Sequence, residues 1–308
     1  MNWKIKSIIQ NIVSFLPTNI SYELYYKIQR NFGELKNINP ESRIKGAIDI
    51  FDYIRDADRE FKNKIFFEVG TGRIPIIPIA LWIMGAKKIY TVDVNPYLKI
   101  ELIKECIDSI LENQNYYFSL FGERIYEKRL SELIFYFSKN NDLELDQYLN
   151  FFNIYYMYQI DKSKFDNLNG KIDYHISFTV LEHVPKKDLF NIFDYGNKIV
   201  KKNGIFIHRI DYSDHFSHSD NKISSINFLK YSDIYWKFYG DNKYMYTNRL
   251  RHDDFLEFYN KIEHKLLKID LFINKNLDKR LLKLDKRFQH KDNKVIQTEG
   301  SWIISEKK

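Results

Sequence analysis

The amino-acid sequence predicts a doubly wound α/β fold, that is, a Rossmann-like, mostly parallel sheet with helices on both faces. Two observations support this prediction. From residue 64 onward, short apolar segments alternate with longer segments of helical periodicity, which is the pattern of repeated strand–helix–strand units. The first apolar segment, Ile65–Val69, leads directly into the turn Gly70–Gly72, and the second ends at Asp93. In doubly wound folds the ligand binds beside such turns, outside the carboxyl ends of the strands.

The individual elements follow from the same alternation. Parallel strands are expected at Ile65–Val69, Lys88–Val92, Ile154–Ile160, Ile172–Phe178 and Ile205–Ile210, with a turn at Asn203–Gly204 before the last of them. Helices are expected at Ile76–Met84, Lys187–Val200, Asn227–Trp236 and Arg251–Lys261. Two further strands, expected to be antiparallel, are Leu266–Ile273 and Trp302–Ser305. Together these elements are sufficient for a single sheet covered on both sides.

The chain is expected to have two parts, residues 1–62 and residues 63–308. Residues 1–62 are predicted to be helical, because Ile44, Ile48, Phe51 and Ile54 recur at helical spacing. Residues 63–308 form the main domain. The stretch between its second and third strands is longer than one crossover helix needs. We therefore expect a helical insertion at about 97–153, made of about three helices.

The composition limits the class of protein and its partners. The one cysteine, Cys106, excludes an intrachain disulfide and a cysteine-rich zinc site, and with no secretory signal evident it indicates a cytoplasmic protein. The longest apolar stretch, Ile74–Ala86, is too short to span a bilayer. The formal net charge is +7, and much of it lies in the basic segment Asn274–Lys294. Acids interrupt that segment and no recognition motif accompanies it, so we expect no nucleic-acid partner.

The glycine turn and Asp93 suit an adenosine-containing ligand. Gly70 and Gly72 allow the backbone to approach a ligand without a Cβ in the way. Asp93 follows Gly72 by 21 residues at the end of the next strand, where an acid can accept hydrogen bonds from both ribose hydroxyls. This pattern fits both NAD and S-adenosylmethionine (SAM).

Two residues favour SAM over NAD. The dinucleotide fingerprint needs a third glycine for close helix packing, and the equivalent position holds Pro75. Glu68 lies two residues before the first glycine, and an acid there suits a ligand that carries a cationic sulfonium and an ammonium group. SAM also has no pyrophosphate that would need the positive end of a helix.

The segment Ile172–Pro185, which contains Leu181-Glu182-His183-Val184, resembles the fourth-strand motif of class I SAM-dependent methyltransferases. Lys201–Phe206 is similar to the entry of their fifth strand, although Asn203 and a single glycine replace the usual Pro-Gly-Gly. The resemblance covers roughly residues 64–210. It implies that SAM, with S-adenosylhomocysteine (SAH) as its product, contacts a set of residues in the turns after the strands: Glu68, Gly70, Thr71, Gly72, Asp93, Asp161 and Glu182.

A narrower resemblance extends over three motifs: Gly70–Arg73, His208–Asp220 and Tyr244–Arg251. These are similar to motifs of a bacterial methyltransferase group that is associated with surface-polysaccharide and O-antigen gene clusters. The resemblance implies that the acceptor is a sugar or a glycan precursor.

The segment His208–Asp220 holds three histidines and three aspartates just after a predicted strand. It is expected to bind the acceptor and to act as acid and base together with His183, and the candidate catalytic residues are His183, Asp211 and His215. Two alternatives stay open: a polar surface loop whose Asp and Ser residues cap helices and turns, and a divalent metal site. No metal ligand is assigned. Asn248, Arg249 and Arg251 are further candidates, for clamping an anionic acceptor. For Arg251 the alternative is an ion pair with Asp253 or Asp254.

The sequence thus indicates a SAM-dependent methyltransferase that methylates a hydroxyl of a sugar or glycan precursor. Two other functions were weighed against it. One is an NAD-dependent sugar-modifying oxidoreductase or epimerase, which would need a third glycine near position 75 and a Tyr-x-x-x-Lys pair. The other is a catalytically silent protein of the same fold that serves as a partner. The complete set of Glu68, the glycine turn and Asp93 argues against the silent protein.

Overall fold

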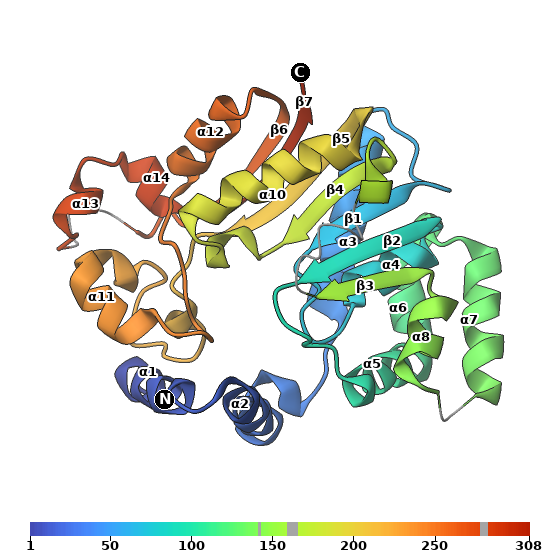
Figure 1. Cartoon of the computed structure of the whole chain (residues 1–308), viewed down its shortest axis with the longest axis horizontal. Coiled ribbons are helices and arrows are strands. Elements are labelled where there is room, and N and C mark those ends of the chain that lie inside the picture. Colours follow the sequence, from blue (N-terminus) through green and yellow to red (C-terminus); the bar gives the residue numbers. More distant parts are fainter. Residues whose placement is uncertain (141–142, 159–165, 278–282) are drawn as a thin grey trace.

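The computed structural model describes residues 1–140, 143–158, 166–277 and 283–308. A seven-stranded sheet forms its centre, in the order β3-β2-β1-β4-β5-β7-β6 (Figure 1). The strands are β1 (Ile65–Val69), β2 (Lys88–Asp93), β3 (Ile154–Tyr158), β4 (Ile172–Phe178), β5 (Val200–Asp211), β6 (His264–Ile273) and β7 (Thr298–Lys307). This arrangement confirms the predicted doubly wound α/β fold.

The directions of the strands are mixed at one end of the sheet only. β3, β2, β1, β4 and β5 are all parallel, as predicted. β7 is antiparallel to both of its neighbours, β5 and β6. β6 therefore points the same way as the first five strands, and β7 alone is reversed among the described strands.

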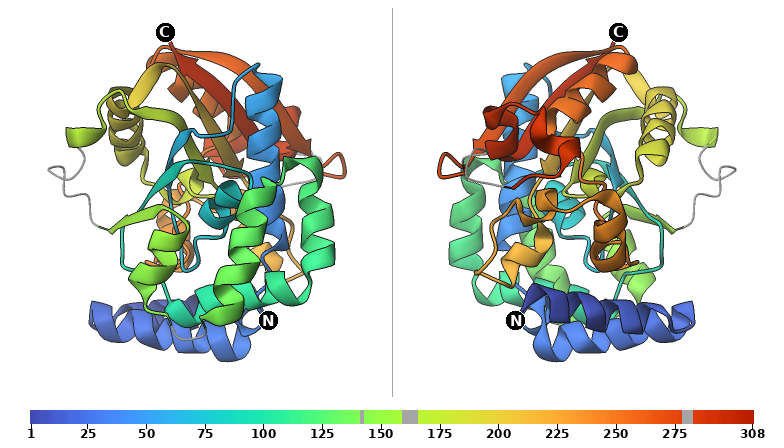
Figure 2. Two further views of the ribbon diagram at one scale, coloured as in Figure 1. Left: turned by 90° about the vertical axis from the view of Figure 1, so that its right-hand side faces the viewer. Right: turned by 90° about the vertical axis from the view of Figure 1, so that its left-hand side faces the viewer.

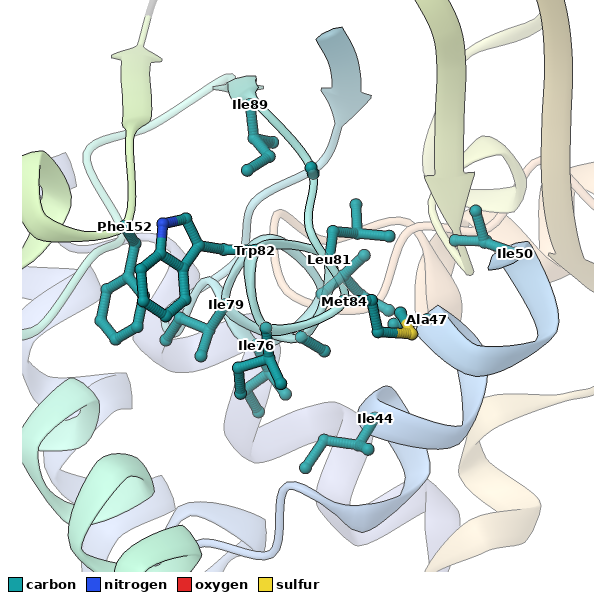
Figure 3. Close-up of a cluster of buried hydrophobic side chains, with 14 of the residues drawn as sticks. Ile44, Ala47, Ile50, Ile76, Ile79, Leu81, Trp82, Met84, Ile89 and Phe152 are labelled. Atoms are coloured by element: carbon teal, nitrogen blue, oxygen red, sulfur yellow. The ribbon is translucent and has the colours of Figure 1, made fainter. Parts of the chain in front are cut away.

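The helices on one face of the sheet form the larger core. They are α3 (Glu41–Asp56), α4 (Ile76–Ile83), α5 (Ile100–Glu112), α6 (Gln114–Phe121), α7 (Glu127–Lys139) and α8 (Leu145–Phe151). Figure 3 shows α4 at the centre of this core, with Ile44 of α3 beneath it and Trp82 beside Phe152. The described part of the insertion between β2 and β3 thus holds four α-helices, where about three were predicted.

The opposite face carries α10 (Lys186–Ile199) and α12 (His252–Lys261), which pack on β4, β5 and β7. A third, smaller core joins distant parts of the chain: Trp3 near the N-terminus, Trp236 of α11 (Asp233–Gly240), Phe288 of α13 (Lys286–Gln289) and Ile296 of α14 (Asn293–Gln297). The 3₁₀ helices are η1 (Glu34–Lys36), η2 (Gly122–Arg124), η3 (Asp166–Leu168), η4 (Leu181–His183), η5 (His215–His218) and η6 (Asn227–Lys230).

The N-terminal segment is helical, as predicted, but its helices have different roles. α3 belongs to the core of the main sheet, whereas α1 (Trp3–Ser14) and α2 (Thr18–Phe32) run along one edge of the molecule (Figure 2). α1 turns Trp3, Val13 and two polar side chains, Ser7 and Gln10, inward. The other apolar side chains of the helix and of the two residues after it are exposed: Ile5, Ile8, Ile9, Ile12, Phe15 and Leu16. α1 is therefore held by Trp3 and by polar contacts, such as that of Ser7 Oγ with the carbonyl of Tyr239 at 2.5 Å.

Two predicted boundaries differ from the structure. No separate turn precedes β5 at Asn203–Gly204, because β5 already begins at Val200; instead its pairing with β4 shifts register between Val200 and Ile205. Glycine is required at 204 because a Cβ there would lie 2.6 Å from the carbonyl oxygen of Asp173. The third strand ends at Tyr158, and the last two residues predicted for it lie outside the described part of the chain.

His208 lies in the sheet core, so its predicted place in the acid–base segment is wrong. Its Nε2 is 2.9 Å from Nδ1 of His175, and its Nδ1 is 2.6 Å from the hydroxyl of Tyr259. Burial lowers the pKa of His175 to about 3 and that of His208 well below its usual value. Both imidazoles are therefore neutral in the folded protein at physiological pH.

This buried pair predicts a pH-dependent stability. An unfolded histidine has a pKa of about 6.5, so the unfolded chain takes up protons below that pH while folded His175 does not. The stabilisation is complete above pH 6.5 and is lost as the pH falls toward the folded pKa. Between pH 7.5 and 5.5 the free energy of unfolding of the wild type should fall by about 1.4 kcal/mol more than that of H175N, as measured by urea unfolding. An equal pH dependence of the two proteins would contradict this.

Candidate functional site at the carboxyl edge of the sheet

The glycine turn after β1 has the conformation that only glycine adopts easily. Gly70 and Gly72 have φ angles of 91° and 69°. A Cβ on Gly70 would also lie 2.2 Å from Cγ2 of Val180 in the loop after β4, whereas nothing lies within 4 Å of a Cβ on Gly72. The turn is thus packed on one side and leaves space for a ligand beside Gly72.

Asp93 at the end of β2 is tied directly to this turn. Its Oδ2 accepts a hydrogen bond from the backbone N–H of Gly72, and its Oδ1 accepts one from Val94, both at 2.8 Å. Burial raises the pKa of Asp93, and the backbone N–H groups oppose that shift. Each carboxylate oxygen retains a further lone pair, so the side chain can also accept hydrogen bonds from ribose hydroxyls.

Glu68 lies beneath the turn in a short chain of hydroxyl groups. The Oγ1 of Thr91 donates to Glu68 Oε2 at 2.5 Å and lies 2.6 Å from Oγ1 of Thr71. Burial raises the pKa of Glu68 to about 7, although the hydrogen bond from Thr91 opposes the shift. The sequence analysis missed Thr91. It lies two residues before Asp93 on the same strand, and this period-2 spacing places both on one face.

Arg43 of α3 is a second residue that the sequence analysis missed. Its guanidinium donates to the carbonyl of Phe178 at 3.2 Å and lies 5.1 Å from the centre of the Phe178 ring. Burial lowers the pKa of Arg43, and the charges of Glu68 and Glu182 oppose that shift. The cation thus lies close to two buried acids. No motif in the sequence signals it, because only tertiary packing brings α3 to the end of β4.

The loop after β4 presents Glu182 and His183 on η4. The side chain of Glu182 is buried, and burial raises its pKa to about 8, against the charge of His215. Nδ1 of His183 lies 2.6 Å from the carbonyl oxygen of Tyr246, which makes Nδ1 the protonated nitrogen. The amide of Asn248 fixes the loop by donating to the carbonyls of Leu181 and Val184.

Asp211, the last residue of β5, and His215, in the loop after it, meet the loop that follows β4. The rings of His183 and His215 have their centres 4.8 Å apart, and Nε2 of His215 is 3.4 Å from Oδ2 of Asp211. Burial lowers the pKa of His183 to about 4, and the charge of His215 adds to the shift. For His215, Asp211 outweighs burial and raises the pKa. All three candidate catalytic residues therefore lie together, and His218 stacks on His215 at 5.2 Å.

Other polar residues of the segment His208–Asp220 have structural roles. Asp214 caps η5 through the backbone N–H of Phe216 at 2.9 Å. Asp220 accepts a hydrogen bond from the backbone N–H of Trp3 at 2.9 Å. The segment thus combines two of the alternatives weighed above, because Asp211 and His215 face the site while Asp214 and Asp220 hold the fold together.

The predicted arginine clamp is wrong. Arg249 is buried and donates to the carbonyls of Phe228 and Tyr231. Arg251 is fully buried and donates to several backbone carbonyls, including that of Thr298 at 2.7 Å. Arg249 also forms an ion pair with Asp233. Both guanidinium groups are thus held by partners within the fold, and they are not available to a methyl acceptor.

Part of the basic segment Asn274–Lys294 is also neutralised within the fold. Lys291 is buried and lies 2.8 Å from carboxylate oxygens of both Asp253 and Asp254. Arg287 pairs with Asp233 at 2.6 Å. These two cations are therefore not free for a phosphate backbone.

Aromatic side chains of α2 pack against the loops at this edge of the sheet. The ring of Tyr22 lies 5.4 Å from Tyr97, in the loop after β2, and 5.7 Å from Tyr244. Arg73, directly after the glycine turn, lies over the rings of Tyr26 and Tyr97. α2 thus connects the loops after β1 and β2 with the segment that carries Tyr246.

Hollows elsewhere on the surface do not coincide with these residues. One of about 460 Å³ is lined by Asn39, Glu41, Ser42 and Lys45, and another of about 280 Å³ lies among Lys64, Asp173 and Lys201 at the opposite end of the strands. The convergence of polar groups therefore defines the site better than surface shape. Asp161, expected to contact the cofactor, lies outside the described residues.

Comparison with known proteins gives structural likeness only. No protein-family model and no curated protein matches the sequence. Among solved structures, the chain is similar to protein PH0226 of Pyrococcus horikoshii, with 12% identity, a TM-score of 0.48 and coverage of 92% of this chain and 98% of that one. A SAM-dependent methyltransferase of Mesorhizobium loti has 10% identity, a TM-score of 0.45 and coverage of 86% and 100%. Magnesium protoporphyrin IX methyltransferase of Synechocystis, solved with SAH, has 12% identity, a TM-score of 0.42 and coverage of 98% of this chain and 100% of that one.

At this level of identity and overlap, the likenesses say nothing about the acceptor. The fold assignment rests on the chain itself. Five parallel strands are followed by a sixth in the same direction, and the reversed β7 is inserted between β5 and β6. This is the class I methyltransferase fold that the sequence resemblance predicted. Among the described residues, no helix is both long and apolar enough to cross a membrane.

Proposed function

We propose that this chain is a SAM-dependent methyltransferase. The observation that carries the proposal is the hydrogen bond between Gly72 and Asp93, which joins the glycine turn and the acid at the carboxyl edge of a sheet with a reversed β7. Dinucleotide-binding sheets of the NAD enzymes are parallel in the order 3-2-1-4-5-6 and carry a third glycine in the turn. This chain has the reversed strand and Pro75 instead, so the NAD-dependent alternative is disfavoured.

The residues at the edge fit the parts of SAM. Asp93 can accept hydrogen bonds from the ribose hydroxyls, and Gly72 leaves room for the ligand. The buried acids Glu68 and Glu182 suit a ligand with a sulfonium and an ammonium cation. Arg43 supplies the cation that the carboxylate of the methionine moiety needs. When bound, SAM supplies a methyl group activated by the positive sulfur.

The chemistry that remains for the chain is to place an acceptor and to remove its proton. In O-methylation the acceptor oxygen forms a bond to the methyl carbon as the carbon–sulfur bond breaks, and the electron pair neutralises the sulfur. The hydroxyl proton must leave, because a protonated hydroxyl is a poor nucleophile. The cluster of His183, Asp211 and His215 is the place where we propose that the acceptor hydroxyl is held.

For the acceptor we propose a sugar or glycan precursor of surface-polysaccharide biosynthesis, methylated in the cytoplasm. The resemblance of the motif His208–Asp220 supports this class, and so do the carboxylate and imidazole groups, which suit the hydroxyls of a sugar. The aromatic rings of Tyr22 and Tyr244 offer apolar faces beside the loops at this edge of the sheet. The single buried cysteine, Cys106, is consistent with a reducing compartment.

Calorimetry with the purified full-length chain tests the cofactor. We expect SAM and SAH to bind in the micromolar range and to raise the melting temperature, because a ligand that binds only the folded state stabilises it. NAD and NADH at the same concentrations should give neither signal. Binding of NAD without binding of SAM or SAH would contradict the proposed function.

A further inference from the structure

Three side chains of the site bring metal-binding atoms together. One ligand-type atom from each of Glu182, His183 and His215 lies within 4.8 Å of the other two. Glu182 and His183 come from the loop after β4, and His215 comes from the loop after β5. We propose that this Glu–His–His cluster holds one divalent transition-metal ion, a role that the sequence analysis did not assign.

The buried acid is the first reason. Glu182 is 4% exposed, and neither of its carboxylate oxygens has a hydrogen-bond partner among the described residues. Nε2 of His215 is also buried and makes no hydrogen bond among them, and its ionic neighbour, Oδ2 of Asp211, approaches it only at 3.4 Å. A buried polar group without a partner costs about 1–3 kcal/mol, and a charged one costs more. A cation bound between these atoms would remove that cost for both side chains.

The orientation of His183 is the second reason. Nδ1 of His183 donates to the carbonyl of Tyr246 at 2.6 Å, which leaves the lone pair of Nε2 free for a ligand bond. In metal-binding histidines, the N–H of the other ring nitrogen almost always donates a hydrogen bond to a carbonyl, a carboxylate or water. Asn248 holds the loop that carries Glu182 and His183 by donating to the carbonyls of Leu181 and Val184. The groups around the cluster therefore orient it as the surroundings of a metal site do.

The donor set indicates the kind of ion. Two imidazoles and one carboxylate suit Mn²⁺, Fe²⁺, Co²⁺ or Zn²⁺ better than Mg²⁺ or Ca²⁺, which prefer oxygen ligands. Three protein ligands leave coordination positions open for water or a substrate, as in catalytic metal sites. An ion with open coordination positions would bind acceptors with adjacent hydroxyl oxygens, such as sugars; this step rests on the proposed function. A hydroxyl bound to the ion would lose its proton to solvent more readily, because the ion lowers its pKa.

Manganese provides the direct test, because bound Mn²⁺ loses its six-line electron paramagnetic resonance signal. Wild-type full-length protein, stripped of metal with EDTA, should bind one Mn²⁺ per chain, and Zn²⁺ should displace it. We expect Mn²⁺ affinity to fall by about 100-fold or more in each of three variants, E182Q, H183N and H215N. Replacing a residue that only holds a ligand in place costs less, about 10–100-fold. H183N is the most conservative of them, because an asparagine amide can still donate to the carbonyl of Tyr246. H290N, which changes an exposed histidine of the C-terminal region, should bind Mn²⁺ like wild type.

SAH affinity, measured on the same samples, separates this inference from the proposed function. The melting temperature shows which variants remain folded, because Glu182 is itself expected to contact the cofactor. Wild-type protein that binds SAH but takes up neither Mn²⁺ nor Zn²⁺ would overturn the metal site and leave the methyltransferase standing. Wild-type protein that binds one metal ion per chain but not SAH would keep the metal site and overturn the proposed methyltransferase. Variants that bind SAH and still bind Mn²⁺ as tightly as wild type would also overturn the site.

Discussion

Alanine at His183, Asp211 or His215 should lower kcat by about 10²–10⁴-fold, the range that a positioned general base contributes. The reason is the geometry of the cluster, in which the two rings are 4.8 Å apart and Asp211 lies 3.4 Å from His215. SAH affinity should stay nearly unchanged, because the glycine turn and Asp93 are not touched. The measurement is single-turnover methyl transfer from labelled SAM to the acceptor, with SAH calorimetry on the same proteins.

His208 supplies the matched control. It comes from the same segment as Asp211 and His215, but its ring lies in the core against His175 and Tyr259. H208N should therefore lower the melting temperature and leave kcat of the folded protein near the wild-type value. Near-native kcat in all three alanine variants, measured with the true acceptor, would contradict the assignment of the site. If metal removal by EDTA abolishes turnover of the wild type, the loss of kcat in these three variants is explained by an effect on the bound ion.

Asp93→Ala should weaken SAH binding by about 1.5–3 kcal/mol, which is roughly 10–150-fold. The carboxylate has two roles in the structure, because it can accept hydrogen bonds from the ribose hydroxyls and it already holds the N–H of Gly72 at 2.8 Å. Alanine removes both interactions, whereas Asp93→Asn keeps one acceptor oxygen and should lose less. Isothermal calorimetry with SAH provides the measurement.

Asp173 is the control at the other end of the strands. Its carboxylate accepts from the N–H of Ile65 at 2.8 Å and from Lys201 at 2.7 Å, away from the glycine turn. D173A should reduce stability while SAH affinity remains within about twofold of wild type, a difference of roughly 0.4 kcal/mol. If D93A also binds SAH within twofold of wild type, the adenosine assignment of this edge is wrong.

Periodicity was sufficient for the elements whose pattern is local. β1 and β4 have the predicted bounds, Ile65–Val69 and Ile172–Phe178, because a buried parallel strand is a short, nearly continuous apolar run. The predicted turn at Asn203–Gly204 was wrong for a non-local reason. Turn-forming residues indicate a change of direction, but here Gly204 provides a close approach to the backbone of β4, which no local pattern reports.

The site shows the same division. The sequence by itself determined the residues at the ends of the strands, Glu68, Gly70, Gly72, Asp93 and Glu182, because strand ends and turns leave a signal within a few residues. It also determined that His183 and the segment after β5 would lie at the same edge, since parallel strands bring their carboxyl ends together. Only the tertiary structure decided which side chains of His208–Asp220 face that edge, that Arg43 joins the acids there, and that Arg249 and Arg251 do not. These outcomes depend on which atoms a folded neighbour brings within about 3 Å, the range of a hydrogen bond. That neighbour lies 135 residues along the chain for Arg43 and Phe178, and 47 for Arg251 and Thr298.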